Sequence, residues 1–137
     1  MKKNFCLLFT AVLLVCCFFA AGCSSGYTSS YKAVGFVHTE TDELGSMSFA
    51  EFEGVKVFEL KFKDSFDKSL LYTLKLETGS ATIYYDTNGD KVKLTSVKAG
   101  DKIDDKLKDL KCETMYIIVE TNEKCLNGSF EFKAKTL

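Results

Sequence analysis

The sequence predicts an all-β fold, an antiparallel β-sandwich of the jelly-roll kind with about eight strands. Three observations predict it. From position 33 onward, apolar residues alternate with polar ones over short stretches, which is the period of a strand with one buried face. Short turns, several of them with glycine, separate these stretches, as in antiparallel sheets. Several stretches are apolar on one phase only, which favours two facing sheets over a closed barrel.

The expected strands are 33–39, 46–53, 55–63, 70–76, 80–86, 92–97, 115–120 and 128–133. In the third strand, the apolar phase slips by one residue between Val57 and Phe58, which predicts a β-bulge. The seventh, MYIIVE, is apolar on both phases, so we expect it in the centre of a sheet with both faces covered.

Two connections carry information about the chain between the strands. Asn88-Gly89 predicts a two-residue type I′ hairpin turn, because both residue types tolerate a positive φ. In 99–111, Ile103, Leu107 and Leu110 have the spacing of one helix face,. So short a helix is marginal without partners, so we expect a loop with one helical turn.

Residues 1–22 have the composition of an export signal. Lys2 and Lys3 are followed by an apolar run over 5–21 and then by small residues directly before a cysteine,. Ala20-Ala21-Gly22-Cys23 resembles the lipobox of bacterial lipoproteins, with Ala20 where leucine is commonest. The resemblance implies cleavage between Gly22 and Cys23 and a diacylglyceryl group on the Cys23 thiol. Simple secretion and an uncleaved membrane helix are the alternatives, since the run is at the lower limit for spanning.

Three segments follow from this organisation: a signal peptide at 1–22, a lipid-anchored flexible tether at 23–32, and a β-sandwich domain at 33–137. Two acyl chains bind a membrane firmly, so we expect a membrane partner and a location on the extracytoplasmic face of the cell membrane. The chain has no arginine, proline or tryptophan. This absence is typical of an AT-rich genome and favours a Gram-positive source.

The charge balance argues against a nucleic-acid partner. Removal of residues 1–22 leaves 115 residues, enough for one domain with its own core,. That part contains 16 lysines and 19 acids, so its net charge is negative. Phosphate recognition depends instead on basic clusters and on bidentate guanidinium groups.

Residues 75–133 contain, in order, a strand at 80–86, the turn Asn88-Gly89, and strands at 92–97, 116–120 and 128–132. This order resembles the small β-sandwich modules of Gram-positive surface lipoproteins and of bacterial pre-peptidase C-terminal domains. The opening stretch 33–39 also resembles that of uncharacterised clostridial-type lipoproteins, while Cys112-Glu113-Thr114 stands where those families carry a glycine. The resemblance implies a fold and a location, and no catalytic residue.

Two cysteines remain once the signal peptide and the lipid are accounted for, Cys112 and Cys125. If 115–120 and 128–133 pair as a hairpin, Cys125 lies near its turn and Cys112 near its open end, roughly 26 Å away at about 3.3 Å per residue. A disulfide needs Cα atoms within about 7 Å. We therefore expect free thiols, with a Cys112–Cys125 disulfide as the alternative.

No catalytic, metal or cofactor motif is present. His38, the only histidine, precedes three acids, but a lone histidine beside acids is common on loops. Asp86 to Asp90 departs from a calcium loop because its glycine comes two positions early. Tyr72, Tyr84 and Tyr116 could form a platform for stacking sugars; packing in the core is the alternative.

Two functions are compatible with an anchored sandwich that carries no catalytic motif. The first is a non-catalytic binding module for a cell-envelope or surface ligand, such as a glycan. The second is a structural or accessory subunit that docks to another envelope protein through a sheet edge. An enzyme is not expected, because no pair of side chains has an activating spacing.

Overall fold

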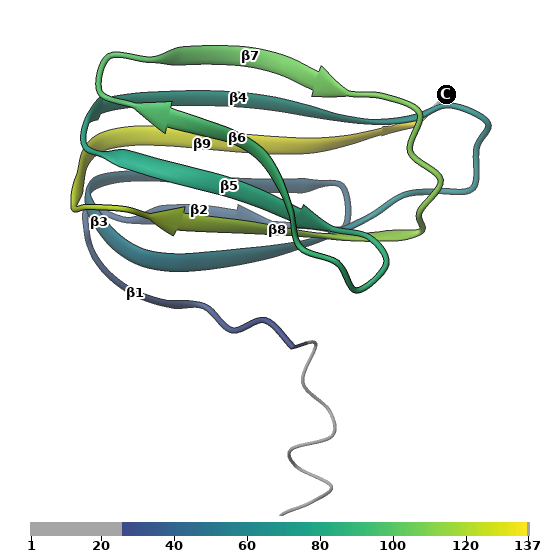
Figure 1. Cartoon of the computed structure of the whole chain (residues 1–137), viewed down its shortest axis with the longest axis horizontal. Helices are drawn as coiled ribbons and strands as arrows, with labels where there is room; N and C mark the ends of the chain where they lie inside the picture. The colour runs from purple at the N-terminus through teal and green to yellow at the C-terminus, as the bar shows by residue number, and fades with distance from the viewer. Residues whose placement is uncertain (1–25, 137) are drawn as a thin grey trace, which may run out of the picture.

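The computed structural model describes residues 26–136, which form nine β-strands and no helix (Figure 1). Residues 1–25, with the expected signal peptide and Cys23, lie outside the described part. The strands are β1 (Ser30–Val34), β2 (Val37–Glu40), β3 (Leu44–Lys61), β4 (Lys68–Thr78), β5 (Ser80–Asp86), β6 (Val92–Lys98), β7 (Lys102–Leu107), β8 (Thr114–Thr121) and β9 (Cys125–Thr136). None of the described residues belongs to a helix able to cross a membrane.

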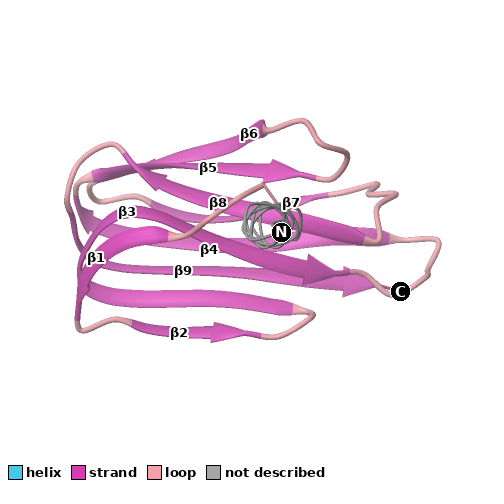
Figure 2. Ribbon diagram, turned by 90° about the horizontal axis from the view of Figure 1, so that it is seen from below, coloured by secondary structure: helices cyan, strands magenta, loops and turns pink. Residues whose placement is uncertain are grey.

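The strands form two antiparallel layers that face each other (Figures 1 and 2). The back sheet contains β2, the first half of β3, β9, β4 and β7, in that order. The front sheet contains the second half of β3, then β8, β5 and β6. The predicted all-β antiparallel sandwich is therefore confirmed, with nine strands in place of about eight.

Four long segments of the chain, which we call ribbons, pass from one sheet to the other at the same end of the molecule, on the left in Figure 1. We call this the bend end. β3 bends near Gly54, β4 passes into β5 at Gly79, and β6–β7 and β8–β9 turn through 99–101 and 122–124. The opposite end, which we call the loop end, carries the connections 41–43, 62–67, 87–91 and 108–113.

Glycine is required where the ribbons bend. Gly79 has a φ of +103°, and a Cβ there would lie 2.7 Å from the carbonyl oxygen of Lys124. Gly54 has a φ of +131°, and its Cβ would lie 2.3 Å from the carbonyl oxygen of Ser30. Both values are far inside van der Waals contact, so any side chain would force neighbouring ribbons apart.

The hairpin between 115–120 and 128–133, assumed above for the distance between the cysteines, is not formed. β8 and β9 do not pair with each other, because both lie along the same edge of β3: Glu120 is opposite Val55, and Cys125 is opposite Phe52. The chain therefore follows β3 around the bend. Cys112 is half-buried at the loop end and Cys125 is buried at the bend end, and both are free thiols.

The bulge expected at Val57 and Phe58 is also absent, since β3 and β8 keep one register from Val55 to Lys61. The phase slip has another cause: Lys56 faces the interior, and Val55 and Val57 face outward. Val55 and Val57 are thus apolar residues on the outer face of the front sheet, where strand alternation ordinarily places polar ones,.

Two further expectations need correction. Residues 99–111 contain the edge strand β7, because Ile103 and Leu107 also fit a period of two and pack against the core. The stretch 33–39 is divided by Gly35, at a φ of +61°, into β1 and β2. β1 begins at Ser30, so the sheet includes residues assigned above to the tether.

The core between the sheets is aromatic and aliphatic. The largest fully buried side chains include Phe52, Phe58, Phe130 and Phe132, and each contributes about 1.5–3 kcal/mol through burial. The predicted alternation in β4 and β9 is observed, and β8 lies between β3 and β5 as expected of a central strand.

The bend at Gly79 gives a test of the fold. Gly89 also has a positive φ, +100°, but a Cβ there meets nothing within 4 Å. Gly89→Ala should therefore destabilise the fold by about 1–3 kcal/mol through backbone strain alone, and Gly79→Ala by about 1–3 kcal/mol more through overpacking. Urea unfolding of both variants measures the difference; equal costs would contradict the bend described here.

Candidate ligand-binding face

The outer faces of the two sheets differ in character. On the back sheet, most outward residues of three neighbouring strands are exposed and charged, although Leu71 and Thr73 of β4 also face outward and are half-buried. The charged ones include Lys75 on β4, Lys102, Asp104 and Lys106 on β7, and Glu131 and Lys133 on β9. This is the solvated surface that strand alternation ordinarily produces.

The outer face of the front sheet carries a group of aromatic and apolar side chains, beside the exposed charges of Glu59 and Lys61 on β3. Because β8 is apolar on both phases, its outward residues are Tyr116 and Ile118, and Ile118 is only 1% exposed although it lies outside the inter-sheet core. The register places Val57 of β3 and Tyr84 of β5 on either side of Ile118. Tyr116 and Tyr84 are diagonal neighbours, about 7–8 Å apart in such a sheet.

The chain before β1 adds a third tyrosine to this face. The ring of Tyr27 lies 5.8 Å from that of Tyr116, at 45°, and the Tyr27 hydroxyl donates a hydrogen bond to Oδ2 of Asp86. We call this surface, made of Tyr27, Tyr84, Tyr116, Ile118, Asp86, Lys91 and Glu120, the tyrosine face.

Asp86 is fixed by several donors at once. It is 4% exposed, and its Oδ1 accepts hydrogen bonds from the backbone N–H groups of Asn88 at 3.0 Å and Gly89 at 2.6 Å. The Tyr27 hydrogen bond, together with these backbone donors, lowers the pKa of Asp86 against the opposing effect of burial. The same contact raises the pKa of Tyr27.

This arrangement also corrects the predicted type I′ turn. Gly89 has a positive φ, but Asn88 does not, so the two-residue geometry is absent. The connection spans 87–91, and the carboxylate of Asp86 caps its amides. The hairpin itself was correctly predicted, since β5 and β6 pair as antiparallel neighbours.

Lys91 and Glu120 supply charge beside the rings. The Lys91 ammonium lies 2.6 Å from Oε1 of Glu120 and 4.2 Å from the centre of the Tyr84 ring, a cation–π contact. Both charged side chains are about one-third exposed, so they are available to a ligand that lies on the face.

The three tyrosines singled out from the sequence do not lie together. Tyr84 and Tyr116 share the tyrosine face, but Tyr72 faces the core of the back sheet and is 6% exposed. Burial is the main cause that raises the pKa of Tyr72, and Asp105 adds to it. Sequence reasoning missed Tyr27 as a member, because its Ser-rich surroundings were assigned to a tether.

The only histidine, His38, lies elsewhere, in the edge strand β2. Glu40 forms an ion pair with Lys56, whose side chain is only 7% exposed, and its carboxylate lies 3.9 Å from Nδ1 of His38. The His38 ring stacks on Phe36 at 5.1 Å. Glu40 therefore neutralises a lysine that faces the interior, and this cluster has a structural role. Among residues 26–136, no group of three metal-ligating side chains occurs.

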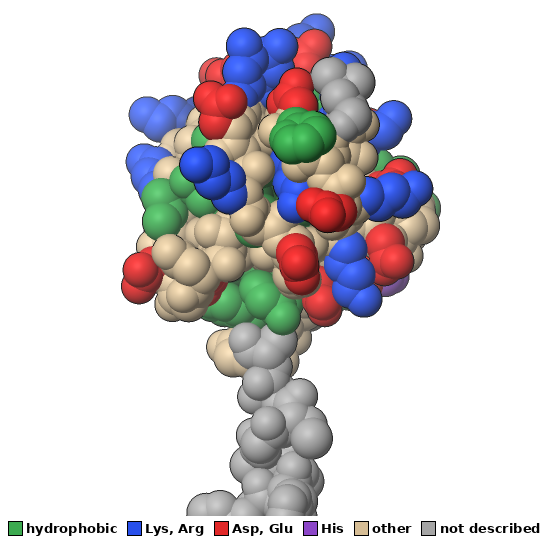
Figure 3. All heavy atoms as spheres, turned by 90° about the vertical axis from the view of Figure 1, so that its right-hand side faces the viewer, with side chains coloured by type: hydrophobic (Ala, Val, Ile, Leu, Met, Phe, Trp, Pro, Cys, Tyr) green, Lys and Arg blue, Asp and Glu red, His purple; other side chains and the backbone are tan. Residues whose placement is uncertain are grey.

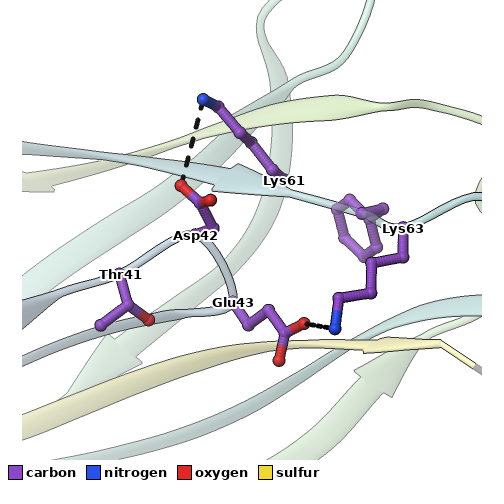
Figure 4. A pocket seen from close by; sticks show the side chains of 6 residues that line it. Thr41, Asp42, Glu43, Lys61 and Lys63 are labelled. Atoms are coloured by element: carbon purple, nitrogen blue, oxygen red, sulfur yellow. Dashed lines mark ion pairs between the residues drawn. The ribbon is translucent and has the colours of Figure 1, made fainter.

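A hollow at the loop end is less suited to a ligand. It lies where the two ends of β3 meet, and it is lined by Thr41, Asp42, Glu43, Lys61, Phe62 and Lys63 (Figure 4). Two ion pairs cross it, Lys61–Asp42 at 4.0 Å and Lys63–Glu43 at 3.1 Å. Lysines and acids are interspersed over much of this end (Figure 3). Exposed ion pairs of this kind contribute little to stability.

The tyrosine face offers contacts to a ligand, but neither of its carboxylates is free to transfer a proton. Asp86 is occupied by three donors, and Glu120 is held by Lys91. What the face offers is two half-buried rings on adjacent strands, with a carboxylate and an ammonium beside them. Such a surface suits an extended ligand with apolar patches and a polar rim.

Comparison with known proteins gives a likeness in fold only. No protein-family model matches the chain, and no curated protein sequence matches it. TmCBM61, solved in complex with β-1,4-galactotriose, is 16% identical, with a TM-score of 0.45 over 87% of this chain and 94% of its own. The carbohydrate-binding module CBM6cm-2 from Cellvibrio mixtus lichenase 5A, solved with cellotriose, is 10% identical, with a TM-score of 0.40 over 77% and 90%.

A cupin domain from Bordetella pertussis is similar at the same level: it is 13% identical, with a TM-score of 0.34 over 77% of this chain and 98% of its own. All three TM-scores are below 0.5. The likenesses therefore carry no argument about function, and the tyrosine face has to support any proposal by itself.

The Tyr27–Asp86 contact should make stability depend on pH. The folded-state pKa of Asp86 lies below its ordinary value of 3.8, so its stabilisation is complete above that value and is lost as pH falls through the lowered pKa. The pKa of Tyr27 lies above 10.0, so its contribution is lost only as pH rises past that value.

Tyr27→Phe removes the phenol donor, so the pKa of Asp86 should rise and acid unfolding should begin at a higher pH. Carboxyl NMR titration and circular dichroism measure the two effects. Tyr31→Phe, four residues further along the chain, is the matched control and should change neither. An unchanged Asp86 pKa in Tyr27→Phe would show that the hydrogen bond is not made in solution.

Proposed function

We propose that the chain is an extracytoplasmic lipoprotein whose sandwich is a non-catalytic binding module, and that its ligand is a glycan of the cell envelope. The observation that carries the proposal is the tyrosine face: aromatic side chains gather on one outer face of the sandwich, while the described strands of the other outer face present mostly charged and polar residues and no aromatic ring.

The chemistry of the tyrosine face matches that of a sugar chain. A sugar ring has apolar C–H faces and a rim of hydroxyl groups, and the faces pack on aromatic rings such as Tyr84 and Tyr116. Lys91 and Glu120 can exchange charge-assisted hydrogen bonds with the rim.

The anchoring is supported by the sequence before the described residues. Ala20-Ala21-Gly22-Cys23 follows an apolar run and a positive start, as in a lipobox. A diacylated Cys23 would hold the domain at the membrane without any help from the protein surface, because each buried CH₂ contributes about 0.8 kcal/mol.

A second function, that of an accessory subunit, is favoured by one observation. β2 is an edge strand that pairs only with β3 among the described strands. Its first residue, Val37, is 66% exposed, and Val34 at the end of β1 is 57% exposed. An edge of this kind can accept a strand of a partner protein. We rank it second, because the edge offers only four residues for pairing.

Retention on an array of envelope glycans and peptidoglycan fragments tests the first function. The protein should be retained by at least one glycan, and Tyr84→Ala should lose most of this retention because a ring on the face is removed. Thr73→Ala is the control, since Thr73 is half-buried on the outer face of the back sheet. Both variants should keep the circular dichroism of the wild type.

Two results would count against the binding function. A folded protein that no glycan retains would favour the accessory role through β2. Equal retention of Tyr84→Ala and the wild type, with a loss in Thr73→Ala, would move the binding site to the back sheet.

A further inference from the structure

The N-terminal chain enters the fold along the tyrosine face. Ser30 is opposite Val55 on β3, the hydroxyl of Ser29 accepts a hydrogen bond from the N–H of Val57 at 2.9 Å, and Tyr27 reaches Asp86. Followed towards the N-terminus, the chain thus runs from the bend end towards the loop end. It is attached to the front sheet as far back as Tyr27.

This attachment shortens the distance between the anchor and the domain. Tyr27 is the fourth residue after Cys23. An extended chain spans at most about 3.6 Å per residue, so the two Cα atoms lie within about 14 Å of each other. The bend end is further away, because β5 runs roughly 17 Å from Tyr85, near the loop end, to Ser80 at the bend end,.

The loop end also carries apolar groups without an inward role. Phe66, on the β3–β4 connection, is completely exposed, and Val92, at the start of β6, is 44% exposed. Phe66 follows the end of β3, and Val92 follows the end of β5 across the 87–91 connection. Both strand ends lie at the loop end, because Lys61 pairs with Thr114 and Asp86 with Tyr116, at the start of β8. Exposed aromatic side chains are favoured where a membrane meets water.

We propose that the loop end rests on the lipid headgroups of the membrane, held there by the Tyr27 contact and by Phe66. The proposal rests on the lipid at Cys23 that the proposed function includes. Lysines and acids are interspersed over the loop end (Figure 3), so this end has no large patch of one charge sign to attract a membrane. The orientation is therefore held by apolar contact and by the short link to the anchor.

The orientation restricts the ligand. The tyrosine face begins at the loop end, where Tyr27, Tyr116 and Asp86 meet, so its first contacts lie close to the headgroups. The ligand class is therefore a glycan that reaches the membrane surface, such as the headgroup of a glycolipid or the membrane end of an envelope polymer. A glycan confined to the outer layers of the envelope is excluded.

Tryptophan fluorescence tests the orientation, because the chain contains no tryptophan. One reporter is placed at the loop end by Phe66→Trp or Thr87→Trp, and the other at the bend end by Ala99→Trp; all three positions are exposed. The full-length lipidated protein is bound to phosphatidylcholine vesicles that contain a headgroup-spin-labelled lipid. Quenching should be strong at positions 66 and 87 and weak at position 99.

Tyr27→Ala should abolish this difference in quenching. Without the Tyr27–Asp86 contact, the chain leaves the domain at a later residue, so the link to Cys23 is longer and the domain can reorient. Tyr31→Ala, in the same segment, should preserve it. Circular dichroism and the urea midpoint confirm that each variant is folded. If one of the loop-end reporters perturbs the fold, the other decides the result.

The outcomes separate this proposal from the proposed function. Equal quenching at the two ends of vesicle-bound protein overturns the orientation but leaves glycan retention on the array as it was. Quenching that survives Tyr27→Ala overturns the role of the contact. Failure of the wild type to float with vesicles, or flotation of Cys23→Ser, contradicts the anchor and the orientation together.

Discussion

The register between neighbouring ribbons is the constraint on which the rest of the structure depends. The β8–β9 ribbon lies beside β3 on both sides of the bend. It also lies beside the β4–β5 ribbon on both sides, since Thr78 is opposite Leu126 and Ala81 is opposite Thr121. Because neighbours are kept, all ribbons turn at one level. Backbones meet there at distances that only glycine permits at Gly54 and Gly79.

The same register decides what the protein presents to its surroundings. Once Ile117 and Val119 of β8 face the core, Tyr116 and Ile118 must face outward,. Val57 and Tyr84 are then brought beside Ile118 by pairing alone. The contact of Tyr27 with Asp86 adds the N-terminal chain to this surface, so the features proposed for binding and for anchoring share one face.

The sequence predicted the fold class and most strands, because the alternation in β4, β5 and β9 is strong. It did not predict the order of pairing, since a period of two says which side of a strand is buried and nothing about its neighbour. Lys56 broke the apolar phase of β3, and the spacing of Ile103 and Leu107 fits a helix and a strand equally well. Tyr84 and Tyr116 were found as candidates, whereas Tyr27 depends on a contact 59 residues away in the chain.

The central claim, that the ligand lies on the tyrosine face, is tested most directly by amide chemical-shift mapping. The spectrum of the protein is recorded with and without an oligosaccharide of the retained glycan. The account predicts that shift changes concentrate on β5, β8 and the 87–91 connection, around Tyr84, Tyr116 and Lys91. Changes centred on the back sheet around Thr73 and Glu131, or on the hollow lined by Asp42 and Lys61, would contradict it.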